Sequence, residues 1–294
     1  MALVNLKGHG ATRAQSVTLG AGRSALIVPI TGANASQIAS RARAIERSAA
    51  DIVEWRVDGL GSLDTAIIQG ALQVLRRETS RPILATYRTR VQGGEGNPTD
   101  SLRVAKVVLE AGVDALDIEE TDPNADEIAA LVYEGGAVPV LSVHDFERTP
   151  GVEALIKKLT EMQARVESWF ERAQQDAGKL DALNRASDSS KELAERGPGV
   201  IKIACMANEP MDALKVAVAV RRFADAYQQL PAIALAMGED GELTRAFAGA
   251  IGSAATFTML AGESSAPGQI DIEALANFAR ETSALKLAGR AGEV

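Results

Sequence analysis

The chain has 294 residues, of which 46% are hydrophobic and 24% charged, and its formal net charge is −8. This is the composition of a globular protein with a substantial core, and the lack of any long block of like charges argues against a nucleic-acid surface or a polybasic membrane patch. Because no apolar run approaches the roughly 18 residues of a membrane span and the first residues carry no signal-peptide pattern, we expect a cytoplasmic protein with neither membrane nor nucleic acid as a partner.

The chain opens on a short lead-in, in which Ala2–Leu6 and Ser16–Leu19 are predicted to pair as a hairpin. After it, short β-rich apolar runs alternate with amphipathic helical stretches, the pattern of βαβ units around a parallel sheet. The predicted strands are Ala25–Ile30, Ile52–Val57, Ile83–Arg88, Ala115–Glu119, Val138–Val143, Val200–Met206, Ala232–Met237 and Thr256–Leu260. The predicted helices include Ser36–Ser48, Asp64–Arg77, Ser101–Ala111, Asp126–Glu134, Met211–Tyr227 and Ile272–Thr282.

The number and spacing of these elements favour an α/β fold of the (β/α)₈ TIM-barrel type, which typically takes about 250 residues. A doubly wound sheet remains the alternative, because periodicity cannot show whether a sheet closes. The first strand is not followed by G-x-G-x-x-G, which disfavours a dinucleotide-binding fold. Since no Pro/Gly/Ser-rich linker divides the chain, we predict one domain over residues 1–294.

One connection is longer than the others, between the fifth and sixth predicted strands. Apolar residues recur there at helical spacing, at Leu155, Leu159, Met162, Val166, Trp169 and Ala173. A polar break at Gly178–Lys179 precedes a second predicted helix, Leu180–Glu195. We therefore predict a helical insertion over 151–198, packed outside the barrel as a hairpin, with a lid or a partner-binding surface as the alternative.

Polar residues inside or just after the barrel strands are the candidates for function, because the reactive groups of TIM barrels lie at the carboxyl ends of the strands. Glu54 and Arg56 share one face of their strand, while Trp55 points to the other. This pair indicates either a site or a structural ion pair. Further polar residues of this kind are Arg88, Asp117 and Glu119.

Lys202 lies within an apolar strand, where lysine is rarely buried without a use. We expect desolvation and neighbouring cations to favour its neutral amine, which can attack a carbonyl group. His144 ends the fifth strand and is followed by Asp145, a position that favours catalysis over a structural role. The chain's other histidine, His9, lies in the lead-in.

A carboxylate-binding group is predicted after the seventh and eighth strands. Arg245 can donate two parallel hydrogen bonds to a carboxylate, with Ser265 and Gln269 as neutral donors. The single cysteine, Cys205, excludes an intramolecular disulfide, and the sequence contains no cluster of metal ligands. We expect neither a metal nor another cofactor.

The motifs EWRVD, ATYR, LDIE, SVHDFERTP, IKIACM, GELTR with GSAATF, and SAPGQ occur in the order found in type I 3-dehydroquinate dehydratases. From Ala25 to about Thr282 the chain resembles that family, and it is the whole set of motifs that makes the resemblance specific. The resemblance implies dehydration of 3-dehydroquinate, in either shikimate biosynthesis or quinate breakdown, by a homodimer without a cofactor.

The resemblance also implies roles for single residues. Lys202 matches the lysine that forms a Schiff base with the C3 ketone, and His144 matches the histidine that transfers protons. Expected contacts to the substrate ring hydroxyls and carboxylate come from Glu54, Arg56, Arg88, Arg245, Ser265 and Gln269. Trp55, which lies between Glu54 and Arg56 in the EWRVD motif, is also an expected substrate-binding residue.

Two features depart from the family pattern. Gln92 stands before the paired glycines, where relatives often carry Glu, which removes a possible charge partner for the histidine. The other departure is the long connection between His144 and Lys202.

Two other kinds of protein share part of this pattern. A class I aldolase would also use a lysine on the sixth strand but has no evident need for the EWR and SAPGQ motifs. A catalytically inactive sensor, like part of some quinate-responsive regulators, should have lost Lys202 or His144, and both residues are present.

Overall fold

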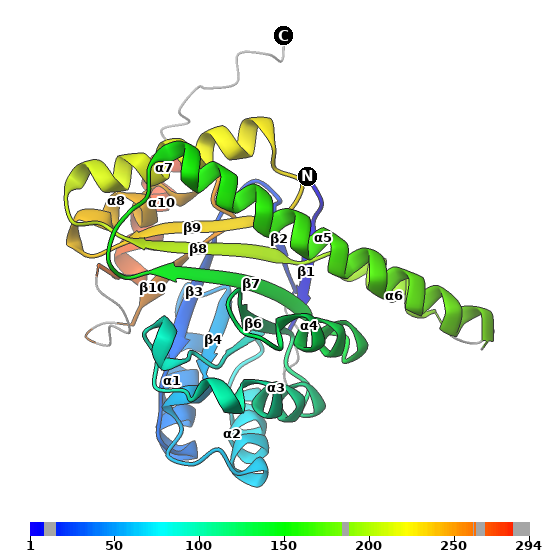
Figure 1. Ribbon diagram of the computed structural model, residues 1–294. Coiled ribbons are helices and arrows are strands. Elements are labelled where there is room, and N and C mark those ends of the chain that lie inside the picture. The colour runs from blue at the N-terminus through cyan, green and yellow to red at the C-terminus, as the bar shows by residue number, and fades with distance from the viewer. Residues whose placement is uncertain (9–15, 184–187, 261, 263–267, 285–294) are drawn as a thin grey trace.

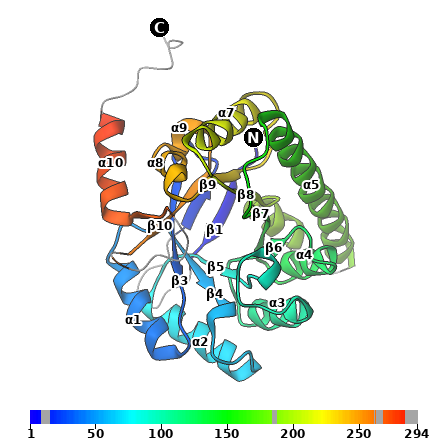
Figure 2. The ribbon, with the colours of Figure 1, turned by 60° about the vertical axis from the view of Figure 1, so that its left-hand side comes forward.

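The main sheet of the protein curls into a barrel that is ringed by helices (Figures 1 and 2). The computed structural model describes residues 1–8, 16–183, 188–260, 262 and 268–284. Within these residues the sheet has nine strands in the order β11-β10-β3-β4-β5-β6-β7-β8-β9. Where its two sides meet, the amide of Ala254 donates to the carbonyl of Ala232 (2.7 Å), which joins the start of β10 to β9. The predicted TIM-barrel fold is confirmed.

The strands of the barrel are parallel to their neighbours throughout. They are β3 (Ala25–Ile30), β4 (Ile52–Arg56), β5 (Ile83–Thr86), β6 (Ala115–Glu119), β7 (Val138–Asp145), β8 (Val200–Met206), β9 (Ala232–Met237) and β10 (Ala255–Met259), with the short β11 (Ile270–Asp271) added beside β10. Two bounds differ from the prediction in a way that matters for the site. β5 ends at Thr86, before Arg88, and β7 continues beyond Val143 because His144 and Asp145 still pair with β8.

Helices cover the outside of the barrel in chain order, as Figure 2 shows. They are α1 (Ala35–Glu46), α2 (Thr65–Glu78), α3 (Ser101–Glu110), α4 (Ala125–Glu134), α5 (Val152–Leu183), α6 (Ser189–Arg196), α7 (Pro210–Ala226), α8 (Glu242–Ala246), α9 (Ala248–Ile251) and α10 (Ile272–Ala284). Single turns of 3₁₀ helix follow several strands: η1 (Val57–Gly59), η2 (Arg90–Gln92), η3 (Pro98–Asp100) and η4 (Glu239–Gly241). In the described part of the chain, no helix combines the length and the apolar character that a bilayer crossing requires.

The barrel has two apolar layers, because successive residues of a strand point to opposite faces. Outward residues such as Val53, Trp55 and Ile201 pack against the helices. Inward residues at the starts of the strands, such as Ile52 and Val200, form a separate cluster inside the barrel.

The predicted N-terminal hairpin is confirmed as β1 (Val4–Lys7) paired antiparallel with β2 (Ser16–Leu19). Its buried residues Val4, Leu6 and Leu19 belong to the cluster inside the barrel. The hairpin therefore forms an apolar floor across the amino-terminal end, and only the carboxyl-terminal end remains for polar chemistry.

The long connection after β7 differs from the predicted hairpin outside the barrel. The stripe predicted from Leu155 to Trp169 is buried, and α5 packs between α4 and α7 as the helix of this βα unit. The predicted break at Gly178–Lys179 is wrong, because α5 continues to Leu183 and extends past α4 (Figure 1). A glycine in a helix costs only about 1 kcal/mol, and burial of the adjoining Ala177 opposes that cost.

The second predicted helix is present but shorter, as α6, which packs against the hairpin floor. Asn5 donates its side-chain amide to the carbonyl of Glu195 (2.7 Å), and Lys7 lies 3.6 Å from the Glu195 carboxylate. The outer part of the connection is thus tied to the beginning of the chain.

The floor generates a prediction about stability. Leu6 is 3% exposed, so Leu6→Ala should lower the free energy of unfolding by about 2–5 kcal/mol through lost burial and a residual cavity. Leu3 is 49% exposed on the same segment, and Leu3→Ala should stay within about 0.5 kcal/mol of the unsubstituted protein. Urea unfolding measures both. Equal effects of the two substitutions would show that the hairpin is not part of the core.

Candidate functional site

Toward the carboxyl ends of the strands, the inward-facing residues change from apolar to polar. Neighbouring strands pair Thr86 with Asp117, Glu119 with Ser142, and Ser142 with Lys202. A cavity opens above this polar layer. The predicted residues that line it are Glu54, Arg56, Arg88, His144, Lys202, Arg245 and Gln269.

Two of the expected substrate-binding residues are not part of this group. Trp55 is fully buried in the layer between strands and helices, because it alternates with Glu54 and Arg56 along β4. Its inclusion among the substrate-binding residues is therefore not supported by its position. Ser265 lies outside the described residues, as does His9.

Lys202 lies at the centre of the polar layer and is 4% exposed. Its Nζ is 3.1 Å from Oδ2 of Asp117 and 3.6 Å from Oε1 of Glu54. The ring of Phe257 lies on another side, with its centroid 4.5 Å from Nζ. We expected cations next to this lysine, but its nearest charged partners are carboxylates, and Arg88 is reached through Asp117.

Asp117 is the shared partner of the two buried cations. Its Oδ2 is 2.8 Å from Nη2 of Arg88, and its Oδ1 accepts a hydrogen bond from Oγ of Ser142 (2.6 Å). Burial raises the pKa of Asp117, but the Arg88 and Lys202 charges outweigh that effect and hold this pKa well below its usual range. Asp117 is therefore ionised at neutral pH.

Arg88 is held from two neighbouring strands. Its Nη1 lies 3.2 Å from Oε1 of Glu119 and donates to Oγ of Ser142 (3.1 Å). Glu119 also accepts hydrogen bonds from the amide and the hydroxyl of Thr89 (2.8 and 2.6 Å). The guanidinium of Arg88 is thereby fixed at the wall of the cavity.

Glu54 and Arg56 share the inner face of β4, as the sequence predicted, but they have different partners. Arg56 donates from Nε and Nη2 to the two oxygens of Asp58 (2.9 and 2.7 Å). Burial lowers the pKa of Arg56, but the Asp58 carboxylate more than compensates and raises it above its usual value. Glu54 accepts from the hydroxyl of Thr86 (2.9 Å) and faces Lys202. The structural ion pair is thus Arg56–Asp58, which leaves Glu54 directed at the lysine.

His144 is half-buried at the end of β7, and Gln92 of η2 holds it. The side-chain oxygen of Gln92 accepts the backbone N–H of His144 (3.0 Å) and lies 3.2 Å from Nδ1 of the same residue. A backbone N–H can only donate, so the oxygen of the amide must face His144. Because that oxygen cannot donate, Nδ1 must carry the proton and Nε2 holds the lone pair.

The same surroundings keep the His144 imidazole neutral. Burial and the Arg88 and Lys202 charges lower the pKa of His144 well below its usual value, against the opposing effect of Asp117. On its outer side the ring stacks on Phe146, with the ring centroids 5.8 Å apart. A neutral imidazole with a free Nε2 lone pair can accept a proton.

Arg245 of α8 and Gln269, directly before β11, also line the cavity. Arg245 is 1% exposed, and its Nη1 donates to the carbonyl of Ala236 (2.6 Å), which anchors one arm of the guanidinium. Burial lowers the pKa of Arg245 to about 10, so it remains charged at neutral pH. An anchored, charged guanidinium of this kind can bind a carboxylate.

Residues other than those predicted also belong to the site. Phe257 and Asp58 were each visible in a motif, GSAATF and EWRVD, but no chemical signal in the sequence singled them out. The rule that would have found Phe257 is strand alternation, which places it on the inner face with Lys202 as its neighbour.

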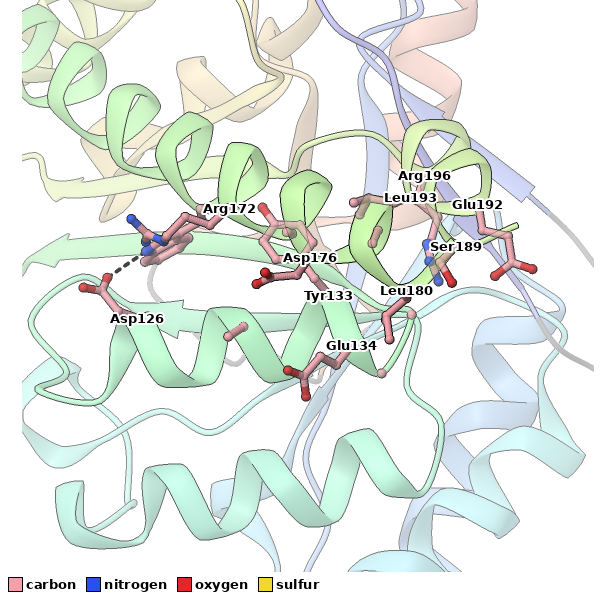
Figure 3. Close-up of a pocket in the computed structure, with 16 residues that line it drawn as sticks. Asp126, Tyr133, Glu134, Arg172, Asp176, Leu180, Ser189, Glu192, Leu193 and Arg196 are labelled. Carbon is pink, nitrogen blue, oxygen red and sulfur yellow. Dashed lines mark hydrogen bonds between the residues drawn. The ribbon is translucent and has the colours of Figure 1, made fainter. Parts of the chain in front are cut away.

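A second, larger cavity lies elsewhere on the molecule (Figure 3). It has a volume of about 570 Å³ and is enclosed by α4, the outer part of α5 and α6. Asp126 and Trp169 both line it, and the Asp126 carboxylate accepts a hydrogen bond from the indole N–H of Trp169 (2.7 Å). None of the predicted site residues lines this cavity, so its size does not mark the chemistry.

Known proteins resemble the chain over almost its whole length. A family model described as Type I 3-dehydroquinase matches residues 26–166 and 178–285, and the intervening residues lie within α5. The 3-dehydroquinate dehydratase of Alkaliphilus oremlandii is 31% identical, over 90% of this chain and 94% of the relative. That of Lactiplantibacillus plantarum is 30% identical, over 94% of this chain and 98% of the relative.

A solved structure gives the same result. The type I 3-dehydroquinate dehydratase of Clostridium difficile, with covalently modified comenic acid, superposes with a TM-score of 0.74 at 27% identity. The match covers 92% of this chain and 96% of that one.

The contact between Gln92 and His144 predicts a pKa shift. The Gln92→Glu substitution places a negative charge beside Nδ1 and should raise the pKa of His144, because an opposite charge favours the imidazolium form. NMR titration of the histidine rings measures this pKa. The chain has two histidines, so the signal that remains in a His9→Gln variant is that of His144.

Gln163 is the matched control, since it is also buried and its side-chain oxygen accepts the backbone N–H of Gln229 (2.8 Å) far from the site. The Gln163→Glu substitution should leave the His144 titration unchanged. An unshifted His144 in folded Gln92→Glu protein would show that the contact does not exist in solution.

Proposed function

The chain belongs to the type I 3-dehydroquinase family, and on that premise we propose that it dehydrates 3-dehydroquinate to 3-dehydroshikimate through a Schiff base on Lys202. The observation that carries the proposal is the position of Lys202. It is a nearly inaccessible lysine in the polar layer under the cavity, with the neutral His144 one level above it on the neighbouring strand. A ketone that enters the cavity would meet an amine and a proton acceptor together.

Imine formation needs an uncharged amine at Lys202 and a group that moves protons. The Nε2 of His144 is the proposed proton acceptor, because its lone pair is free and its imidazole is neutral. Lys202, an ammonium beside Asp117 in the resting enzyme, first gives one proton to Nε2 of His144, and its free amine then attacks C3 of the substrate. His144 carries that proton and a second one from the attacking nitrogen to the ketone oxygen, which leaves as water, while the third proton stays on the cationic imine. Asp117 cannot serve as the base, because its pKa is held far too low. It remains a carboxylate 3.1 Å from the nitrogen and stabilises the cationic imine electrostatically.

The elimination then uses the imine as an electron sink. His144 removes a proton from C2, the electron pair moves toward the cationic nitrogen, and an enamine forms. The return of these electrons expels the C1 hydroxyl, which leaves as water with a proton from His144. Hydrolysis of the conjugated imine releases the product and restores Lys202.

Substrate binding is assigned to the walls of the cavity. We assign the ring hydroxyls to Glu54, Arg56 and Arg88, whose positions are fixed by Thr86, Asp58 and Glu119. Arg245 and Gln269, with Ser265, are assigned to the carboxylate. The activity fits biosynthetic and catabolic pathways alike, and family resemblance supports a homodimer as the assembly.

The imine generates the decisive experiment. Borohydride added with 3-dehydroquinate should reduce a covalent adduct onto Lys202 and inactivate the enzyme, with peptide mass spectrometry locating the adduct. Lys202→Ala should abolish both the adduct and the rise in ultraviolet absorbance of the conjugated enone. Lys215→Ala, which alters a surface lysine paired with Asp212, should retain both. An adduct on another lysine would refute the mechanism.

The carboxylate contact predicts the effect of Arg245→Lys. Lysine keeps the charge but cannot both hold the Ala236 carbonyl and present two parallel donors to a carboxylate. KM should rise about 10- to 100-fold, the range expected for a lost charge-assisted hydrogen bond, with a smaller change in kcat. Arg221→Lys, on the exposed face of α7, is the control. An unchanged KM in Arg245→Lys would exclude the assignment.

A further inference from the structure

We propose that Asp58 is a positioning residue of this site, which sets both the Arg56 guanidinium and the turn that carries Gln92. The inference rests on the proposed function and adds to it a residue that does not line the cavity itself. Asp58 lies in η1, directly after β4, and is 7% exposed. It therefore acts on the site only through the groups it binds.

Four donors converge on the two carboxylate oxygens of Asp58. Oδ1 accepts from Nε of Arg56 (2.9 Å) and from the backbone N–H of Arg88 (3.2 Å). Oδ2 accepts from Nη2 of Arg56 (2.7 Å) and from the backbone N–H of Glu95 (3.2 Å). One carboxylate thus connects the end of β4, the end of β5 and the turn that follows β5.

The hydrogen bond from the Arg88 amide to Asp58 takes the place of a strand-to-strand hydrogen bond beyond the end of β5. β5 ends at Thr86, so the next amides along the chain need other acceptors. Asp58 takes the amide of Arg88, and Glu119, from the opposite neighbouring strand, takes that of Thr89. The two carboxylates thereby hold the backbone in the orientation that directs Arg88 into the barrel.

The contact with Glu95 fixes the turn from Arg88 to Gly96. That turn is closed by backbone hydrogen bonds, including Gly96 N–H to Arg88 O (2.9 Å) and Gly94 N–H to Thr89 O (2.8 Å). It is also tight, since a Cβ at Gly94 would lie 2.1 Å from the carbonyl oxygen of Arg88. Because these contacts tie the turn together, its attachment to Asp58 sets the position of Gln92, which holds His144.

The charge and the second oxygen of Asp58 are both needed for this arrangement. An asparagine offers one oxygen and an NH₂ group, so two of the four donors would face another donor. Arg56 would also lose the carboxylate that both of its donating nitrogens contact. The expected result is a protein that folds but holds Arg56 and the turn less firmly.

The test compares Asp58→Asn with Asp51→Asn. Asp51 is a matched control just before the start of β4, at the opposite end of the strand. Its carboxylate also binds an arginine, Arg23, and a backbone amide, that of Leu26 (2.8 Å). Both substitutions remove the same charge from similar contacts, so both should lower the melting temperature. Only Asp58→Asn should also change substrate binding and the state of His144.

Two readouts distinguish positioning from stability. Asp58→Asn should raise KM for 3-dehydroquinate about tenfold with a smaller effect on kcat, as expected when a substrate-binding arginine is released. The ¹⁵N NMR spectrum of His144 should change from a single Nδ1–H tautomer to a mixture, because Gln92 no longer holds the ring. Asp51→Asn should change neither.

Wild-type KM and a single tautomer in Asp58→Asn would overturn the proposal, as would equal changes in both variants. If Asp58→Asn does not fold, Asp58→Glu decides, since it keeps the charge but displaces the oxygens. Raised KM and mixed tautomers there support positioning, and wild-type values reject it. The tautomer readout needs no substrate. Lack of dehydration by the wild-type protein would therefore reject the proposed function while the role of Asp58 is still tested.

Discussion

A carboxylate buried between two cations organises the interior of this barrel. Bringing charges out of water costs several kcal/mol per ion, and only close partners of opposite sign offset that cost. Asp117 sits within 3.1 Å of both Arg88 and Lys202, and Glu54 and Glu119 continue the alternation of sign around it. Both cations share Asp117, and removing it would leave each with a single carboxylate partner, so the positions of Lys202 and Arg88 are tied to each other. The polar layer behaves as a unit.

The same desolvated environment has opposite consequences for two titratable groups of this site, Asp117 and His144. The two cations near Asp117 keep it ionised, whereas burial and those same cations keep His144 neutral. One group is thereby suited to stabilise positive charge and the other to accept a proton, a separation of roles that active sites commonly obtain from environment alone. Gln92 contributes to the role of His144 without adding charge, since its side-chain oxygen fixes which ring nitrogen of His144 carries the proton.

Much of this arrangement could be predicted from the sequence, because strand alternation is a local property. Lys202 and Glu54 interrupt apolar strands, and the structure places both at the inner face of the barrel. Alternation also places Trp55 on the outer face of β4, away from the cavity, although it belongs to the same motif as Glu54 and Arg56.

What the sequence could not indicate depends on contacts between distant segments. The partners of Lys202 come from β4 and β6, and those of Arg88 from β6 and β7. The early end of β5 follows from acceptors supplied by Asp58 and Glu119, which no local pattern reveals. The continuation of α5 through Gly178 likewise reflects packing that outweighs a weak local preference.

The apolar floor has a consequence for how the chain acquires its structure. The hairpin residues Val4 and Leu6 are made before the barrel strands, yet the cluster they join includes Val200 and Ala255, and Asn5 bonds to Glu195. During synthesis the hairpin must therefore wait for most of the polypeptide, with its apolar side exposed to solvent or to a chaperone. Closure at the amino-terminal end of the barrel is then a late step that joins residues far apart in the sequence, and contacts of such long sequence separation slow folding.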